Sequence, residues 1–327
     1  MSGSRKIFRM KIQAFAPTRI GLFGGGTDVA PYCELYDGLT LSMAISLYQK
    51  VILYSENDIF EIPSNLYPPN ADPSLFYTIF KKYKIDGGHL TKVKSEFDGR
   101  IGAGLGSSAS ACVALIGAIN KRKNLGMYKK DIAQASWEAE EKLMGWHGGK
   151  QDQWAASFGG LNLLSFKGNE VNRTEFSSYY AEKLSQYILL FDTGGSRKSH
   201  EIQKGFLQLT NDQIKNLHLI KLLAKRACQL LIQENFEQIG KVFHEAWLIK
   251  KQSNRGITTE RIDMLYEKAR NVGAVGGKVL GAGGCGYMIF WVPLDKQKDV
   301  ISTLEKEECE HIYYYPDTIG LLVKEIS

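Results

Sequence analysis

The sequence has few cysteines, and none has the spacing of a zinc site or a disulfide framework. The five cysteines lie far apart, and no C-x-x-C pair occurs. No apolar run reaches the length of a membrane span, and the first residues lack the apolar core of a signal peptide. We therefore expect a reducing, cytoplasmic location and no membrane partner.

Two common nucleotide-binding fingerprints are also missing. No G-x-x-x-x-G-K-[ST] occurs, which excludes a P-loop NTPase, and no H-R-D or D-F-G occurs, which excludes a protein kinase. Gly281, Gly283 and Gly286 spell G-x-G-x-x-G, but Y-M-I-F-W-V follows them and predicts a strand. A dinucleotide site needs a helix there, so we reject a Rossmann fold.

Charge and composition are those of an ordinary globular chain. The 327 residues are 44% hydrophobic and 23% charged, and the net charge is +6. The lysines and arginines are scattered, which suits an acidic small substrate at least as well as a nucleic acid. We expect a small-molecule partner and no nucleic acid. The length allows two domains or one large one.

Apolar periodicity divides the chain into strands and helices. Strands are predicted at 10–23, 39–56, 90–98, 187–191, 278–280, 287–292, 311–315 and 318–324. Helices are predicted at 74–84, 108–123, 128–143, 211–234, 236–251, 259–271 and 295–307, and a glycine-rich loop, a short helix and a strand at 145–164. Thr210 and Gln213 form a capping box for one helix. The pattern changes near residue 185, where we place a domain boundary between 1–185 and 186–327.

The segment 102–110 reads G-A-G-L-G-S-S-A-S and precedes an apolar helix. Its three alternating glycines can adopt positive φ and let the backbone approach a ligand. The amides of Ser107, Ser108 and Ala109 would be unpaired donors at the helix start, where the helix dipole favours an anion. A tight turn with a serine N-cap is the alternative. Because three glycines and two serines exceed what a turn needs, we interpret the segment as a phosphate-binding loop.

Asp152 has two interpretations. It could cap the short helix that follows, which would be favoured if the residue stood alone. It could also be the general base or orienting carboxylate for a hydroxyl nucleophile. A neighbouring cation, Arg19 or Lys150, would keep it ionised.

Other charged residues also have two interpretations. Glu138, Glu140 and Glu141 lie near a helix C-terminus, where they oppose the helix dipole. A solvated helix face explains them most simply, and magnesium binding by one of them is the alternative. Arg197 and Lys198, in G-G-S-R-K-S, are either surface charges or hold an anionic group of a substrate.

Three motifs together resemble the kinase superfamily named for galactokinase, homoserine kinase, mevalonate kinase and phosphomevalonate kinase. They are A-P-T-R-I-G-L-F-G-G-G-T-D at 16–28, the glycine loop at 102–110, and K-V-L-G-A-G-G-C-G-Y-M-I-F at 278–290. The resemblance implies an α+β fold with ATP and sugar meeting between two domains. Residues 1–185 would be the ATP-binding domain, like the second domain of ribosomal protein S5, and 186–327 would be ferredoxin-like.

Further motifs narrow the resemblance. G-G-G-T-D, with G-K-Q-D-Q-W-A-A-S-F-G-G-L-N and D-T-G-G-S-R-K-S, resembles the D-glycero-D-manno-heptose 7-phosphate kinases. That family implies transfer of the ATP γ-phosphate to the anomeric C1 hydroxyl, giving the 1,7-bisphosphate for nucleotide-activated heptose (GDP-heptose) synthesis. A kinase of another sugar such as L-fucose, whose kinases share part of the pattern, and a non-catalytic sugar-binding relative are the alternatives. A homodimer is possible.

The resemblance also implies roles for particular residues. Asp152 would be the catalytic carboxylate, and Arg19 would lie near the transferred phosphate. Mg2+ would bind Ser108 and Glu140, with Glu141 as the second choice. The ATP phosphates would be held by Gly102, Gly104, Leu105, Gly106, Ser107, Ser108 and Ala109. The substrate would be held by Gly25, Gly26, Thr27, Asp28, Lys150, Gly283, Arg197 and Lys198.

Two details complete the expected site. Arg197 is the candidate for the 7-phosphate, with Lys198 and Lys150 behind it, and Gly281, Gly283 and Gly284 would form a supporting turn. The family usually has a proline just before the glycine loop, whereas this chain has D-G-R-I-G at 98–102. This departure concerns the geometry at the start of the loop.

Overall fold

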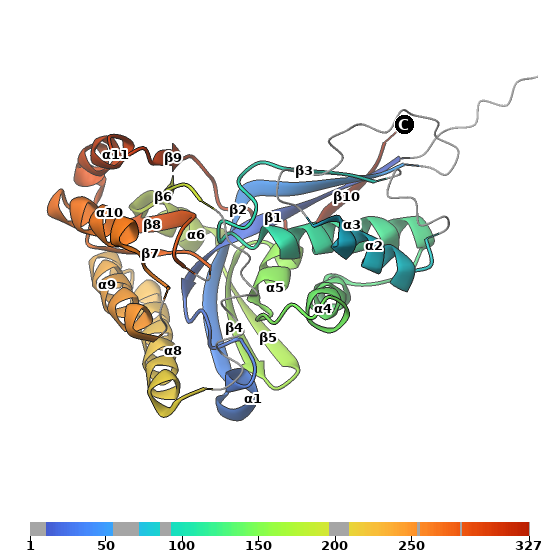
Figure 1. The fold of residues 1–327 in the computed structure, drawn as a ribbon, viewed down its shortest axis with the longest axis horizontal. Helices are drawn as coiled ribbons and strands as arrows, with labels where there is room; N and C mark the ends of the chain where they lie inside the picture. Colours follow the sequence, from blue (N-terminus) through green and yellow to red (C-terminus); the bar gives the residue numbers. More distant parts are fainter. Residues whose placement is uncertain are drawn as a thin grey trace, which may run out of the picture.

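The computed structural model describes residues 11–54, 72–85, 93–195, 209–253, 256–281 and 283–326. Two antiparallel sheets organise them, and helices pack beside each sheet (Figure 1). The structure has the two-domain α+β fold that the motifs imply. None of the helices in the described ranges is both long and apolar enough to span a membrane.

The first sheet has six strands, in the order β10-β1-β2-β4-β5, with β3 paired to β2. Its strands are β1 (Lys11–Phe23), β2 (Gly38–Leu53), β3 (Val93–Phe97), β4 (Leu161–Lys167), β5 (Glu170–Phe176) and β10 (Leu322–Ile326). The predicted segment 39–56 is one long strand. Its first half pairs with β4 and its second half with β3, so β2 holds the sheet together.

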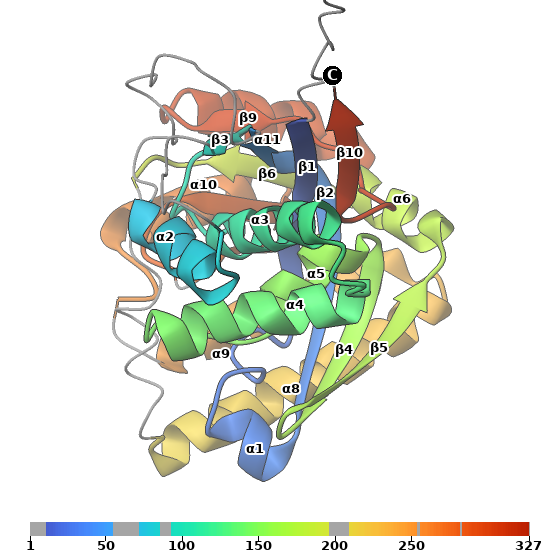
Figure 2. The ribbon, with the colours of Figure 1, turned by 90° about the vertical axis from the view of Figure 1, so that its right-hand side faces the viewer.

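Helices cover the face of this sheet that Figure 2 shows. They are α2 (Pro73–Lys82), α3 (Ser107–Lys123), α4 (Lys129–Glu138) and α5 (Gln151–Phe158). Buried residues surround α3 from Ala109 to Ile119, because the helix contacts the sheet on one side and α4 and α5 on another. A π-helical turn, Ala139–Leu143, extends α4.

The second sheet has the order β7-β8-β6-β9. Its strands are β6 (Ile188–Asp192), β7 (Gly276–Val279), β8 (Tyr287–Trp291) and β9 (Glu310–Ile312), and its helices are α8 (Asn211–Ile232), α9 (Phe236–Ser253), α10 (Glu260–Asn271) and α11 (Gln297–Glu305). Helices α8 to α10 connect β6 to β7, and α11 connects β8 to β9, which is the ferredoxin-like β-α-β-β-α-β order that we expected. The capping box of Thr210 and Gln213 is present at α8.

Three elements were not predicted: α1 (Tyr32–Tyr36), β5 and α6 (Ser178–Tyr187). The strand predicted at 318–324 is β10, and it pairs with β1 in the first sheet, not with the C-terminal strands. A two-residue repeat of burial identifies a strand but not its partner, so the sequence could not place this one. The domain boundary near residue 185 remains a proposal, and Leu322–Ile326 are now assigned to the N-terminal domain.

One hydrophobic cluster spans the two sheets. Residues of β1 and β2 cluster with residues of β6, β8, α8 and α9. The rings of Phe23 and Phe243 lie 4.5 Å apart across this contact. The two halves are therefore packed together where β1 and the glycine loop meet the C-terminal sheet.

Candidate active site

A cavity of about 430 Å3 lies where the two halves meet. The glycine loop, the turn after β1 and the start of α5 line it from the first half. Helices α8 and α9 and the residues at the end of β7 line it from the second half. The cavity therefore brings all three sequence motifs to one place.

The glycine loop has the geometry of an anion site. Gly102, Gly104 and Gly106 have φ values of 72°, 106° and 74°. Gly106 is the N-cap of α3, and no side chain caps the helix. The alternative of a serine N-cap is therefore wrong. The first amides of α3 are left for a ligand, and Ser107 and Ser108 line the cavity.

One predicted loop residue does not face the cavity. Gly102, Gly104, Gly106, Ser107, Ser108 and Ala109 line it, whereas Leu105 is 1% exposed and belongs to the core. The Leu105 carbonyl accepts a hydrogen bond from the Arg19 amide at 3.1 Å. Leu105 therefore anchors the loop on β1, and we withdraw its assignment as an ATP contact.

Close backbone contacts explain why glycine is needed in this loop. A Cβ on Gly104 would lie 2.7 Å from the Leu280 carbonyl oxygen, and a Cβ on Gly281 would lie 2.7 Å from the Gly104 Cα. The glycine loop and the turn after β7 thus touch backbone to backbone. A Cβ on Gly106 would lie 2.8 Å from Asp152 Oδ2, so glycine also makes room for the carboxylate.

Arg100 lies in the segment just before the glycine loop, where the family's usual proline is absent, and it holds the start of the loop in place. Its Nε donates to Asp192 Oδ2 at 2.9 Å, and its amide donates to the Tyr287 hydroxyl at 2.9 Å. Both partners belong to the second sheet. Arg100 therefore fixes the start of the loop to the C-terminal half.

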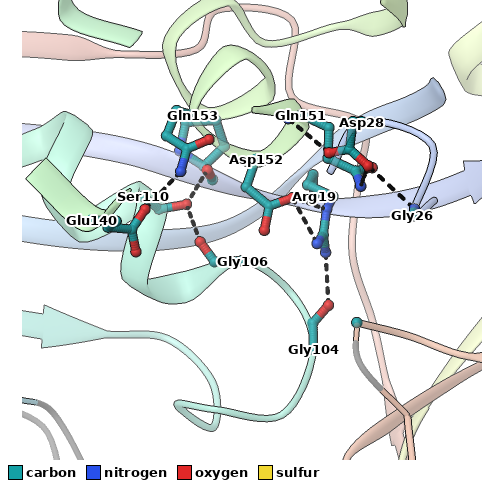
Figure 3. A network of polar contacts seen from close by, with 12 residues as sticks. Arg19, Gly26, Asp28, Gly104, Gly106, Ser110, Glu140, Gln151, Asp152 and Gln153 are labelled. Atoms are coloured by element: carbon teal, nitrogen blue, oxygen red, sulfur yellow. Dashed lines mark hydrogen bonds and ion pairs between the residues drawn. The ribbon is translucent and has the colours of Figure 1, made fainter. Parts of the chain in front are cut away.

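Asp152 and Arg19 form an ion pair at the centre of the site. Arg19 Nε donates to Asp152 Oδ1 at 2.8 Å, and Nη2 lies 2.7 Å from the same oxygen. Arg19 Nη1 donates to the Gly104 carbonyl at 2.7 Å. Figure 3 shows Asp152 beside Arg19, with Asp28 on one side and Glu140 on the other. The Asp152 side chain is 24% exposed, so it can reach a molecule in the cavity.

Of the two cations predicted beside Asp152, Arg19 is the one present. The N-cap of α5 is Lys150, and no side chain caps the helix. The alternative of Asp152 as an N-cap is therefore wrong. Its carboxylate faces Arg19 and the loop, as a proton-accepting group in the cavity would.

Glu140 and Ser108 lie together on the other side of Asp152. The Ser108 hydroxyl donates to Glu140 Oε1 at 2.5 Å, and Gln153 Nε2 donates to Oε2 at 2.6 Å. Burial raises the pKa of Glu140 to about 7, with smaller contributions from the charges of Asp152 and Glu141. A bound cation would lower this pKa and keep the carboxylate ionised.

The structure separates Glu140 from its neighbouring glutamates. Glu141 accepts hydrogen bonds from His147 Nδ1 at 2.8 Å and from the Gly148 amide at 2.9 Å. Glu138 forms ion pairs with Lys142 and Lys82. Of the three glutamates, Glu140 is the one that lines the cavity.

Asp28 is a buried carboxylate in the turn after β1. It is 2% exposed and accepts hydrogen bonds from the Gly26 amide and the Gln151 side chain, both at 3.2 Å. Burial, and then the charge of Asp152, raise its pKa to about 6. A Cβ on Gly149 would lie 1.7 Å from Asp28 Oδ2, so the last glycine of G-W-H-G-G-K gives Asp28 its space.

Three predicted substrate residues lie outside the cavity lining. The Thr27 hydroxyl lies 2.8 Å from the Gly24 carbonyl oxygen and 2.9 Å from that of Leu39, and so holds the turn together. Lys150 Nζ donates to the carbonyls of Gly168 and Asn169 and lies 4.4 Å from the Trp137 ring centroid. A Cβ on Gly283 would lie 2.5 Å from the Ile257 carbonyl oxygen. These residues support the site, and we withdraw the prediction that they contact the sugar.

The outcome for the other predicted substrate residues is divided. Gly25, Gly26 and Asp28 line the cavity. Arg197 and Lys198 lie outside the described residues, so their role stays a prediction.

Sequence reasoning missed two lysines that line the cavity from the C-terminal half. Lys250 Nζ donates to the Gly281 carbonyl at 3.0 Å, and Lys278 Nζ donates to the Leu22 carbonyl at 2.7 Å. Burial lowers the pKa of Lys250 to about 8 and that of Lys278 well below its ordinary value. Lys278 opens the third motif, which was a usable signal, but nothing in the sequence around Lys250 distinguishes it from a surface lysine.

The burial of Asp28 gives a pH-dependent prediction for Asp28→Asn. The folded state raises the pKa from 3.8 to about 6. Ionised Asp28 therefore destabilises the folded state above about pH 6. This destabilisation disappears below about pH 4, where Asp28 is protonated in both the folded and the unfolded state. Relative to the parent, the free energy of unfolding of the variant should rise by on the order of 3 kcal/mol from about pH 4 to about pH 7. Urea unfolding measures this, and a difference that does not change with pH would contradict it.

Comparisons with known proteins agree with this arrangement. Residues 74–160 match the GHMP kinases N terminal domain, and residues 223–310 match the GHMP kinases C terminal domain. A D-glycero-alpha-D-manno-heptose 7-phosphate kinase of Campylobacter jejuni is 30% identical over an alignment of 321 positions, which covers 91% of this chain and 94% of that protein.

Solved structures extend the similarity over the whole fold. A D-glycero-D-manno-heptose 1-phosphate kinase of Bacteroides thetaiotaomicron has a TM-score of 0.75 at 24% identity, over 97% of this chain and 99% of that one. A galactokinase of Lactococcus lactis complexed with galactose has a TM-score of 0.70 at 16% identity, over 97% and 95%. At these identities the two structures support the fold alone. Together with the two domain matches and the Campylobacter jejuni relative, the fold shows that this chain belongs to the GHMP kinases and is a sugar kinase, a phosphotransferase.

Proposed function

We propose that the protein transfers the γ-phosphate of ATP to the anomeric C1 hydroxyl of D-glycero-D-manno-heptose 7-phosphate. The product would be the 1,7-bisphosphate, which is used for GDP-heptose synthesis. The observation that carries this proposal is the Arg19–Asp152 ion pair, because it lies between the glycine loop and the Asp28 turn. The name of the Campylobacter jejuni relative supports the choice of acceptor.

The residues of the cavity have different roles in the proposed reaction. The loop amides hold the ATP phosphates, and Asp152 accepts the proton of the attacking hydroxyl. Arg19 orients Asp152 and offsets charge on the transferred phosphate. Asp28 and Gln151, with the backbone of Gly25 and Gly26, hold the sugar hydroxyls. Positioning and charge neutralisation account for most of the rate.

The donor atoms beside the loop fit a magnesium ion. Mg2+ prefers oxygen ligands and usually binds through one or two protein groups plus the phosphates of the nucleotide. Ser108 and Glu140 supply a hydroxyl and a partly buried carboxylate within 2.5 Å of each other. The ion would neutralise charge on the β- and γ-phosphates.

A panel of acceptors tests the proposed function. The purified protein would be given ATP with heptose 7-phosphate, free heptose, L-fucose or galactose. We expect turnover of heptose 7-phosphate with kcat/KM at least about 100-fold above that of the neutral sugars, because a site that binds the 7-phosphate would have its charges left unpaired by a neutral sugar. Phosphorus NMR of the product should show an anomeric phosphate.

Two other outcomes would change the assignment. Strong turnover of L-fucose with none of heptose 7-phosphate would make the protein a kinase of a neutral sugar. Tight sugar binding without ATP turnover on any acceptor would make it a non-catalytic relative. The intact Asp152, Glu140 and serine loop favour a catalyst.

We also propose a cytoplasmic location, where ATP and sugar phosphates are available, and small-molecule partners in place of nucleic acid or membrane. A homodimer is a further proposal, which the mass in solution would test.

A further inference from the structure

Lys250 and Lys278 are two cations on the C-terminal wall of the cavity that the proposed mechanism does not use. Lys278, on β7, is 8% exposed, and Lys250 is on α9. Each ammonium has one recorded carbonyl acceptor, Gly281 for Lys250 and Leu22 for Lys278. An ammonium has three N–H donors, so a single carbonyl leaves both groups short of partners.

No carboxylate compensates these charges within the described part of the chain. The charged side chain that acts on Lys250 is Arg19, and the charged side chains that act on Lys278 are Lys250 and Arg19, so all of them are cations. Asp152, the nearest carboxylate to Arg19, is already paired with it. Buried charges without a partner destabilise a protein. An anion entering the cavity would remove that cost.

The position of Lys278 points to the acceptor rather than to ATP. Its ammonium lies at the Leu22 carbonyl, three residues beyond Arg19 on β1. At ~3.3 Å per residue this is ~10 Å along the strand, toward the turn that contains Gly25 and Gly26. The glycine loop, which would hold the ATP phosphates, contacts Arg19 itself. Lys278 is therefore on the sugar side of the reacting centre, whereas Lys250, hydrogen-bonded to the Gly281 carbonyl beside Gly104, is at the glycine loop.

We propose that Lys278 binds the phosphate group that the acceptor already carries, so that it selects a phosphorylated sugar. This inference rests on the proposed function. It assigns the anion to a cation of the described structure, and it does not depend on the role predicted for Arg197. A neutral sugar at the same place would leave the Lys278 ammonium without an anion, which gives the site a reason to reject it.

The competing assignment is that Lys278 stabilises the phosphoryl group in transfer. The two assignments affect different kinetic constants. A group that holds the acceptor's own phosphate acts on binding and changes KM, whereas a group that acts only in the transition state changes kcat. The same variant therefore tests both.

The test compares Lys278→Met with the parent, using heptose 7-phosphate and ATP. A charged hydrogen bond contributes enough binding energy that the variant should raise the KM for heptose 7-phosphate about 10- to 100-fold. The kcat and the KM for ATP should change less than about 3-fold. Because methionine removes an uncompensated buried charge, the Tm should stay equal or rise, which guards against misfolding.

Lys251→Met is the matched control. Lys251 follows Lys250 on α9, but its ammonium pairs with Asp263 at 2.6 Å and does not line the cavity. We expect its constants to match those of the parent. A loss of kcat at constant KM in Lys278→Met, or no change at all, would overturn the inference. A parent inactive on heptose 7-phosphate would instead overturn the proposed function.

Discussion

Asp152→Asn is expected to fold like the parent and to lose about 10²- to 10⁴-fold in kcat, the range that general base catalysis contributes. The amide keeps the size of the carboxylate and can still accept a hydrogen bond from Arg19. It cannot accept the proton of the attacking hydroxyl. The loss should fall on kcat more than on the KM for either substrate, because Asp152 acts as the proton leaves. Steady-state kinetics and a thermal unfolding curve measure the two parts.

Asp299→Asn is the control for this variant. Asp299 is exposed on α11, and the structure records no ion pair for it within the described ranges. This control should keep the activity of the parent. Near-native turnover by Asp152→Asn would remove Asp152 from the role of base and leave Arg19 and the loop amides as the catalytic groups.

Glu140→Gln should have the second large effect. The amide preserves the size and can still accept from Ser108, but it removes the negative charge that would hold a cation. Mutation of a residue that only hydrogen-bonds to a metal ligand already lowers metal affinity about 10- to 100-fold. Loss of a ligand should therefore raise the Mg2+ concentration for half-maximal activity by at least about 100-fold. A titration with Mg2+ at saturating ATP and sugar measures this.

Glu141→Gln provides the comparison, because the two glutamates are adjacent in sequence and bind different partners. Glu141 holds His147 and the Gly148 amide, so its variant should keep the Mg2+ dependence of the parent. The opposite result, a large shift for Glu141→Gln and none for Glu140→Gln, would move the metal site to Glu141.

Much of the fold could be predicted from local patterns. The apolar face of α3 and the capping box of α8 are signals contained within a few residues. The missed strand β5, E-V-N-R-T-E-F, is largely polar and partly exposed at the edge of the sheet, so it has no regular alternation to recognise. The helix α6 that follows buries few side chains. Elements with little burial have weak patterns, and these were the ones missed.

The site was predictable where a motif carried it. The glycine loop, Arg19, Asp28 and Asp152 occupy one cavity, as their motifs imply. Lys150 was misassigned because its closeness to Asp152 in sequence does not determine where its side chain points. Its side chain crosses Trp137 and reaches the carbonyls between β4 and β5.

Two further features of the site could be identified only from the three-dimensional structure. The choice between Glu140 and Glu141 depends on how the π-helical turn directs two neighbouring side chains. Lys250 is supplied by a helix far along the chain, and its sequence neighbours do not show that its ammonium is buried.

The pairing of β10 with β1 has a consequence for how the protein folds. These strands lie at opposite ends of the described chain, with the whole second sheet between them in sequence. The strand that carries Arg19 therefore gains its outer neighbour only after residues 322–326 have been synthesised. Contacts of such long sequence separation slow folding, because a large loop must close before they form. During synthesis, the edge of β1 stays open until the C-terminal half has been made.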